Sequence, residues 1–480
     1  MGSEIDESRF TRDDFHAFAR RLKAETETLR QWIREGRVAD ETPRIGLELE
    51  TWLVDAAGRP APRNAEIMGA LPDEPLAPEL ARYNLELNTA PQPLVGRPFS
   101  ALAAELSALW DRLRAAAAQH GCRPAMVGIL PSLHPEDLVL ERMSGLKRYQ
   151  ALNEQVLLLR NRRPIHVDID GPEPLRLTRG DVMLEAAATS VQLHLQVSPR
   201  HAARLYNASL LASAATMALA ANSPRLFGRR LWEETRIPLF EQAVEVGPLH
   251  DGHAGPLARV TFGSGYARDA LYNFFVENRQ HYPVLLPVAL SEPPSRLPHL
   301  VLHNGTVWRW NRPLVGFDAD GRCHLRIEHR VMAAGPTIAD MMANAAFYYG
   351  LVHGLLRQER SVEALLPFTA LEHNFYSAAR RGLEASVRWV GGTDKPLAGL
   401  IADELLPVAE RGLEWLDVAA DERRRHLGIV RERLRTGRTG AAWQEAWLHR
   451  HGRDLSRLTL AYMARQESGE PVHTWDLGRE

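Results

Sequence analysis

Four stretches of the chain place chemically active side chains at every second position. They are the segments 44–54, 82–89, 189–197 and 323–332. Side chains two residues apart in a β-strand lie on one face, so each stretch predicts a strand with one apolar and one polar face. The polar faces carry, in chain order, Glu48, Glu50, Glu86, His194 and Glu328.

Polar faces of this kind are ordinary for antiparallel strands that have one side in water. The composition of these four favours another interpretation, because they contain Glu, His, Gln, Asn and Arg but no Lys. Carboxylates that converge on one sheet face repel and raise each other's pKa unless a cation lies between them. Mg²⁺ prefers oxygen ligands, and such ions neutralise phosphate charge in phosphoryl transfer. The pattern therefore indicates a magnesium-dependent site on a sheet.

Two arginines flank one of these carboxylates. Arg326 and Arg330 lie on the same predicted face as Glu328. Arginine binds phosphate and carboxylate through two parallel hydrogen bonds, so this strand suits a phosphorylated intermediate held beside a metal. The alternative is a ladder of ion pairs along an exposed strand, which would contribute little.

Composition excludes several classes of protein. The chain has 480 residues and a net charge of −2, with 58 basic and 60 acidic residues interleaved. No basic field indicates a nucleic-acid partner. The most apolar stretch, 208–221, is too short to cross a membrane. The only cysteines are Cys122 and Cys323, which excludes a disulfide framework, and we expect buried thiols in a reducing, cytoplasmic compartment.

The remaining pattern predicts an α+β protein that forms a single catalytic unit, 1–480. An N-terminal helical region, 1–43, precedes a sheet-bearing core, 44–335, and a helical C-terminal region, 336–480. Hydrophobic spacing predicts further helices and one short strand. The helices are expected at 10–36, 98–120, 136–160, 200–221 and 267–280, the strand at 124–130, and irregular structure at 59–79 and 283–316.

Six motifs in this order resemble the glutamate–cysteine ligase and carboxylate–amine ligase family. The first is Gly46-Leu47-Glu48-Leu49-Glu50, and the second begins at Glu86 and ends at Pro91. The later ones are Gln192-Leu193-His194, Ile327 to Val331 with Pro336-Thr337, Asn374 to Leu383, and Thr439 to Ala442 with Gly452 to Leu455. Together they span roughly residues 44–475, nearly the whole chain.

The resemblance implies a fold like that of glutamine synthetase, with a curved antiparallel sheet around an active-site funnel. It implies ATP and Mg²⁺ as cofactors and an acyl-phosphate route from a carboxylate and an amine to an amide. By motif, the Mg²⁺ ligands would be Glu48, Glu50, Glu86, His194 and Glu328. Arg330 would stabilise the transferring phosphoryl group, with Glu328 beside it as a catalytic residue. Arg326 is not part of the family's core motif, and its place on the same face as Glu328 makes it a further candidate nucleotide contact.

The same resemblance suggests amino-acid substrates, with glutamate as acyl donor and cysteine or another amine as acceptor. Where the family often has a second histidine, this chain has Gln196, so the resemblance leaves the substrate and the subfamily open. Homodimer formation is also left open. Candidate substrate contacts are Asn88, Arg148, Tyr149 and Gln192, and candidate nucleotide contacts are Asn374 and Arg380. For Arg148, an exposed basic turn is the alternative.

Three other patterns can be interpreted either as functional sites or as purely structural features. His166, Asp168 and Asp170 alternate and could bind a metal, but a turn before Gly171-Pro172 also explains them. The glycines of 263–265 could hold phosphate at a helix N-terminus, or form only a loop. The cluster Trp308, Trp310 and Arg312 could line the active site or stack on adenine, although aromatic residues more often simply pack.

Two other functions remain open from the residues. A metal-dependent hydrolase could use the same carboxylates and His194 without ATP. A non-catalytic relative could bind nucleotide or another ligand and lack turnover.

Overall fold

The computed structural model describes residues 5, 9–246 and 258–478. Its centre is an eight-stranded sheet in the order β13-β14-β8-β1-β3-β2, with β4 and β5 also paired to β1. Every pairing in this sheet is antiparallel. The strands are β1 (Arg44–Asp55), β2 (Leu76–Pro78), β3 (Asn84–Asn88), β4 (Gln92–Pro93), β5 (Cys122–Ala125), β8 (Ser190–Val197), β13 (Asn311–Phe317) and β14 (Cys323–Ala333).

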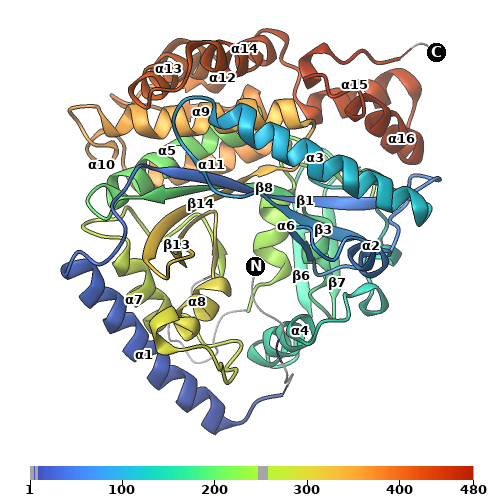
Figure 1. The fold of residues 1–480 in the computed structure, drawn as a ribbon. Helices are drawn as coiled ribbons and strands as arrows, with labels where there is room; N and C mark the ends of the chain where they lie inside the picture. Colours follow the sequence, from blue (N-terminus) through green and yellow to red (C-terminus); the bar gives the residue numbers. More distant parts are fainter. Residues whose placement is uncertain (1–4, 6–8, 247–257, 479–480) are drawn as a thin grey trace.

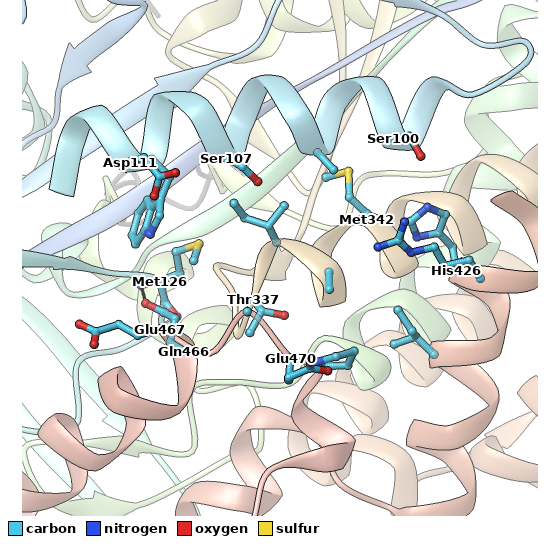
Figure 2. Close-up of a pocket in the computed structure, with 18 of the residues that line it drawn as sticks. Ser100, Ser107, Asp111, Met126, Thr337, Met342, His426, Gln466, Glu467 and Glu470 are labelled. Carbon is cyan, nitrogen blue, oxygen red and sulfur yellow. Dashed lines mark hydrogen bonds between the residues drawn. The ribbon is translucent and has the colours of Figure 1, made fainter. Parts of the chain in front are cut away.

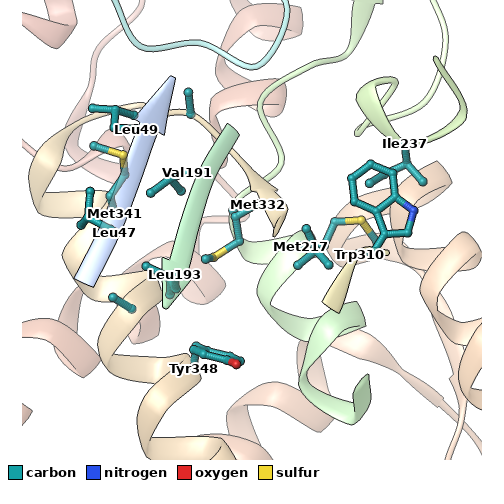
Figure 3. Packing of buried hydrophobic residues seen from close by; sticks show 14 of the residues in the cluster. Leu47, Leu49, Val191, Leu193, Met217, Ile237, Trp310, Met332, Met341 and Tyr348 are labelled. Atoms are coloured by element: carbon teal, nitrogen blue, oxygen red, sulfur yellow. The ribbon is translucent and has the colours of Figure 1, made fainter. Parts of the chain in front are cut away.

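The apolar face of this sheet packs on two long helices, α5 (Ala202–Leu219) and α9 (Ile338–Leu356). Leu47 and Leu49 of β1 and Leu193 of β8 are almost fully buried. Figure 3 shows them facing Met341 and Tyr348 of α9. Burial of large apolar side chains is the main stabilising contribution in such a layer. Because the apolar face of each strand is buried against these helices, the polar face points away from them.

The polar face of the sheet curves around a second set of elements, which lie below the sheet in Figure 1. The N-terminal helix α1 closes this side at its outer edge, because Glu25 accepts hydrogen bonds from His299 Nδ1 at 2.6 Å and from the backbone N–H of Leu300 at 2.8 Å. The elements here are α1 (Arg12–Arg34), α4 (Lys147–Leu159), β6 (Ile165–Ile169), β7 (Leu175–Arg179), α6 (Arg236–Ala243), α7 (Tyr272–His281) and α8 (Pro298–Gly305).

The C-terminal part is helical, and its later helices pack beyond α9, near α3 (Pro98–Gln119) (Figure 1). A small hairpin of β15 (Ser386–Arg388) and β16 (Asp394–Pro396) interrupts it, where the sequence pattern predicts only a break between helices. The helices are α10 (Val362–Leu365), α11 (Phe368–Arg381), α12 (Leu397–Leu400), α13 (Leu406–Trp415), α14 (Ala420–Thr436), α15 (Gly440–His451) and α16 (Leu455–Gln466).

Several boundaries differ from the sequence prediction. The region 59–79 contains α2 (Asn64–Ala70) and β2, and 283–316 contains α8 and most of β13. Helix α4 begins at Lys147, so only the second half of the predicted helix 136–160 is α-helical. Strand β5 ends at Ala125, short of the predicted 130. Proline-rich sequence favoured irregular structure, but tertiary packing formed short elements there.

The remaining strands are short pairs outside the main sheet. They are β9 (Arg225–Leu226) with β10 (Arg229–Arg230), and β11 (Val260–Thr261) with β12 (Trp308–Arg309). Cys122 and Cys323 are buried free thiols, as predicted. In the described ranges, no helix combines the length and apolar character needed to cross a membrane.

Candidate active site

The long central strand β1 brings the predicted site residues together. Its Glu48 lies opposite Gln192 of β8 on one side and Asn88 of β3 on the other. Its Glu50 lies opposite Glu86 of β3. Strand β8 in turn pairs with β14. That pairing sets His194 opposite Glu328. Antiparallel partners point to the same face, so four strands contribute side chains to one polar surface.

One group on this face consists of Glu48, His194 and Glu328. The Nε2 atom of His194 lies 3.1 Å from Glu48 Oε1 and 4.0 Å from Glu328 Oε1. One ligand atom from each of the three residues lies within 4.8 Å of the other two. These strands come from distant parts of the chain, and their pairing places the alternating polar side chains on one surface.

Glu328 is held by two arginines on the same face. Arg312 of β13 donates from Nε and Nη2 to the two carboxylate oxygens at 2.8 and 2.9 Å. Arg330 Nη1 donates to Glu328 Oε2 at 3.2 Å and also to the amide oxygen of Gln192. Burial alone would raise the pKa of Glu328, but the charges of Arg312, Arg330 and His194 outweigh it and hold the pKa well below its usual range.

A second group consists of Glu50, Glu79 and Glu86, again with ligand atoms within 4.8 Å of one another. Glu50 Oε2 accepts from the backbone N–H of Ser190 at 2.6 Å, and Glu50 Oε1 accepts from Gln192 Nε2 at 2.8 Å. Glu79 follows β2 immediately and has no strand alternation to mark it, so sequence reasoning missed it. The sequence left the number of metal ions open, and in the structure the predicted ligands lie in two groups.

The acids of this face strongly perturb one another. Burial, and then the neighbouring charges of Glu48 and Glu50, raise the pKa of Glu86 to about 8. Burial and then the charge of Glu86 raise the pKa of Glu79 well above its usual value. Glu48 behaves differently: burial would raise its pKa, but His194 outweighs this effect and lowers the pKa to about 2. A cation between these groups would relieve their repulsion.

The residues fit a divalent ion such as Mg²⁺. Five carboxylates and one imidazole converge, a donor set dominated by the hard oxygens that Mg²⁺ prefers. Glu48 Oε2 and Glu79 Oε1 are buried without a hydrogen-bond partner among the described residues. Buried charged oxygens that lack a partner are costly, so coordination gives them a physical reason. Glu48, His194 and Glu328 would hold one ion, and Glu50, Glu79 and Glu86 another.

The profile of glutamate-cysteine ligase family 2 (GCS2) matches residues 44–463 of the chain. The chain belongs to this family. It is therefore an ATP-dependent ligase. No curated protein matches the chain by sequence.

Two solved structures are similar to this ligase at low sequence identity. Glutamate–cysteine ligase from Francisella tularensis, solved in complex with AMP, has a TM-score of 0.53 at 12% identity, covering 92% of this chain and 91% of that one. A bifunctional glutathione synthetase from Pasteurella multocida has a TM-score of 0.49 at 14% identity, covering 88% and 53%. The first likeness agrees with the predicted curved antiparallel sheet of the glutamine-synthetase-like ligases.

The candidate substrate residues of this ligase lie around the second group. Arg148 Nη2 and the Tyr149 hydroxyl both donate to the carbonyl oxygen of Pro78, at 3.2 and 2.8 Å. Pro78 directly precedes Glu79, so both side chains lie at that group's edge. Asn88 Nδ2 donates to Glu86 Oε1 at 3.0 Å. Gln192 connects the two groups, since its amide contacts both Glu50 and Arg330.

The candidate nucleotide residues of the ligase are distributed differently. Arg326 is close enough to Glu48 and Glu328 for their charges to act on it, although burial lowers its pKa. Arg380 instead binds both carboxylate oxygens of Asp170, at 2.7 and 2.8 Å. Asn374 binds the backbone of Arg388 through both ends of its amide. The structure therefore brings only Arg326 and Arg330 of this set to the carboxylate face.

The other patterns noted in the sequence have structural roles in the described residues. His166 and Asp168 lie on the exposed β6–β7 hairpin, where Asp168 pairs with Arg176 at 3.1 Å. They do not belong to either candidate metal group of the described residues. The glycines of 263–265 form a loop, because α7 begins only at Tyr272. Trp310 is buried and donates to Glu241 at 2.9 Å.

Arg312 is the residue of the aromatic and basic cluster that reaches the site. Sequence reasoning placed it near Glu328 in the chain but could not assign the contact, because β13 was not predicted. A strand turn at 318–322, with Gly321 at φ +85, returns the chain from β13 into β14. The Asp320-Gly321 pair there is a hairpin signal that could have revealed β13.

Proposed function

We propose that this protein is a carboxylate–amine ligase that works through an acyl phosphate. ATP would transfer its γ-phosphoryl group to a substrate carboxylate, with cleavage of the bond to the β-phosphate and release of ADP. An amine nitrogen would then attack the acyl carbon, phosphate would leave with its bonding oxygen, and the nitrogen would lose a proton. The product is an amide. Glutamate is the proposed acyl donor, and cysteine or another amine is the proposed acceptor.

The observation that carries this proposal is the buried face where Glu48, His194 and Glu328 meet beside Arg330. Arginine can hold a phosphoryl group through its fixed donors, and Arg330 already points along this face toward Gln192. Bound Mg²⁺ would supply charge neutralisation to the phosphate oxygens. Preorganised charges of this kind stabilise a transition state without a covalent enzyme nucleophile.

Two further observations support the proposal. The family profile extends over both groups of carboxylates, from β1 to α16. The Francisella tularensis enzyme of similar fold was solved with AMP, which supports a nucleotide site here. The second group, with Arg148 and Tyr149 at its edge, is the proposed place of the amino-acid substrate, because the Arg148 guanidinium could bind an α-carboxylate.

The experiment is an ADP-release screen of amino acids offered in pairs with ATP and Mg²⁺, followed by mass measurement of the product. The expected result is ADP release that requires both an acid and an amine. The product mass should equal the sum of the two substrates minus water. Glutamate with cysteine is the first pair to test.

Two outcomes would contradict the proposal. Cleavage of an amide without ATP would indicate a metal-dependent hydrolase that uses the same carboxylates. Nucleotide binding with no phosphate release for any pair would indicate a non-catalytic relative. Omission of Mg²⁺, with excess chelator, is the control for the metal requirement.

A further inference from the structure

A large cavity lies on the helical side of the sheet, away from the carboxylate groups. Its volume is about 660 Å³, which is within the range of small-molecule sites. Helix α3 forms one wall, the first turn of α9 and one face of α14 form others, and the segment after α16 lines the remaining side (Figure 2). Its apolar lining includes Trp110, Met126, Ile338, Met342, Ile429 and Pro471.

Charges of both signs line this cavity, and some of them already have partners. Asp111 pairs with Arg114 at 3.4 Å, and Glu467 pairs with Arg123 at 3.3 Å. Within the described part of the chain, Arg425 of α14 and the carboxylate of Glu470 have no ion pair. One cation and one anion therefore face the same space without neutralising each other.

His426 provides a separate indication of a ligand. His426 is 4% exposed and lines the cavity from α14. Among the described residues neither of its ring nitrogens has a hydrogen bond, and the nearest carboxylate oxygen, Glu422 Oε1, is 3.9 Å from Nε2. Its ring packs edge-on against Phe99, and Glu422 forms only a long ion pair with it. A buried imidazole whose ring nitrogens lack hydrogen bonds is costly. In Figure 2 His426 approaches the cavity from the end opposite Asp111, with Thr337 between them.

The N-terminus of α9 contributes further donors. Thr337 caps this 19-residue helix by accepting from the backbone N–H of Asp340 at 3.1 Å. Ile338 and Ala339 line the cavity, and their N–H groups precede the first hydrogen bond of the helix, from Met341 to Thr337. Helix N-termini attract anions through such groups and the helix dipole. The donors, Arg425 and His426 together suit a carboxylate.

We propose that this cavity is a second ligand-binding site, for a short zwitterionic peptide. The terminal carboxylate would lie at the α9 N-terminus with Arg425 and His426, and the terminal ammonium would lie at Glu470. Small apolar side chains would contact Met342 and Ile429. The site is separate from the ligase reaction proposed above, because the sheet lies between them.

The structure also connects the two sites. Helix α9 starts at the cavity and carries Tyr349, whose hydroxyl donates to the carbonyl oxygens of His194 at 2.9 Å and Gly46 at 3.3 Å. These are backbone atoms of the strands that hold the first carboxylate group.

Trialanine is the probe, since it carries both end charges and small apolar side chains. Titration calorimetry on the full chain should show saturable binding of trialanine. The form with acetylated and amidated ends, which lacks both charges, should not bind. Arg425→Ala and Glu470→Gln should each weaken binding at least ten-fold. Arg424→Ala is the matched control, because it removes an exposed neighbour on α14 outside the cavity and should leave binding unchanged.

Glu48→Gln distinguishes this cavity from the carboxylate face and should bind trialanine as the wild type does. Three results would overturn the proposal: no saturable binding to the wild type, equal binding by Arg425→Ala, or loss of binding in Glu48→Gln. Circular dichroism of each variant confirms that it is folded.

Discussion

Arg312 and Glu328 face each other across neighbouring strands and form a two-point ion pair in the interior. Both side chains are almost fully buried, and both carboxylate oxygens accept from the guanidinium, at 2.8 and 2.9 Å. This geometry fixes the orientation of Glu328 and keeps it ionised beside His194 and Arg330.

Arg312→Gln should therefore destabilise the fold by about 3 kcal/mol or more, because removal of one partner leaves a buried charge uncompensated. Urea denaturation measures the loss. Arg312→Lys should recover part of it, since it restores the charge but not the paired donors. A loss below about 1 kcal/mol would show that Arg330 alone holds Glu328.

Glu48→Gln should abolish Mg²⁺-supported turnover in a protein that still folds, with a lower melting temperature because the ion pair with His194 is lost. The amide is similar in size but binds a hard cation far more weakly than a carboxylate does. ADP release over a range of Mg²⁺ concentrations, together with thermal melting, is the measurement. The exposed Glu35→Gln is the matched control. Retained activity would show that the metal assignment is wrong.

Glu79→Gln should raise the Mg²⁺ concentration that gives half-maximal turnover by ten-fold or more. Glu79 offers one of the three carboxylates of the second group. Its burial beside Glu86 raises its pKa, so loss of the charge should not destabilise the metal-free fold. An unchanged Mg²⁺ dependence would place this residue outside the metal site.

Tyr349→Phe should cost about 1 kcal/mol, the usual net value of a buried hydrogen bond, and should also lower turnover. Its hydroxyl fixes the backbone at His194, so its loss reaches a site residue. Tyr348→Phe is the control, because that hydroxyl bonds Ser209 of α5 at 2.8 Å instead of the strand backbone. Chemical denaturation and ADP release separate the two effects. Equal effects of both changes on turnover would exclude this role.

Glu241→Gln should change how stability depends on pH. Burial raises the pKa of Glu241 to about 7, although Trp310 and Tyr376 donate to it. The folded state therefore keeps a proton between about pH 4.5 and 7 that the unfolded state loses, so stability falls as pH rises through this window. The variant has no such loss, and its melting temperature relative to the wild type should increase from pH 5 to pH 8. The expected gain between pH 5 and pH 8 is about 2 to 3 kcal/mol, because nearly two units of the pKa shift fall in this range. A constant difference would contradict the prediction.

The strands with regular alternation were predictable from the sequence. The face on which each of their side chains lies was predictable as well. Glu48, Glu86, His194 and Glu328 each lie at the expected face because alternation has a fixed period of two. The order of the strands in the sheet was not predictable, and that order decides which carboxylates meet. It places Glu50 with Glu86 and Glu79, and it places Glu48 with His194.

The site residues that could not be predicted lie in segments without a two-residue alternation of polar and apolar side chains. Glu79 follows a strand of three residues, too short to show alternation. Strand β13 contains Pro313 and Gly316, which weaken a strand prediction, and the contact from Arg312 was lost with it. The Asn374 and Arg380 hydrogen bonds depend on tertiary partners that only the folded chain supplies.

The strand order delays completion of the sheet during synthesis of the chain. The three residues of the first carboxylate group lie at positions 48, 194 and 328, and β14 pairs between β8 and β13. On the ribosome, β1 and β8 emerge long before β14 does, with one sheet edge unpaired until then. Such distant pairings slow folding, and open strand edges promote aggregation. Recombinant fragments that stop before residue 333 should therefore be poorly folded as well as inactive, and synthesis must pass β14 before the site can exist.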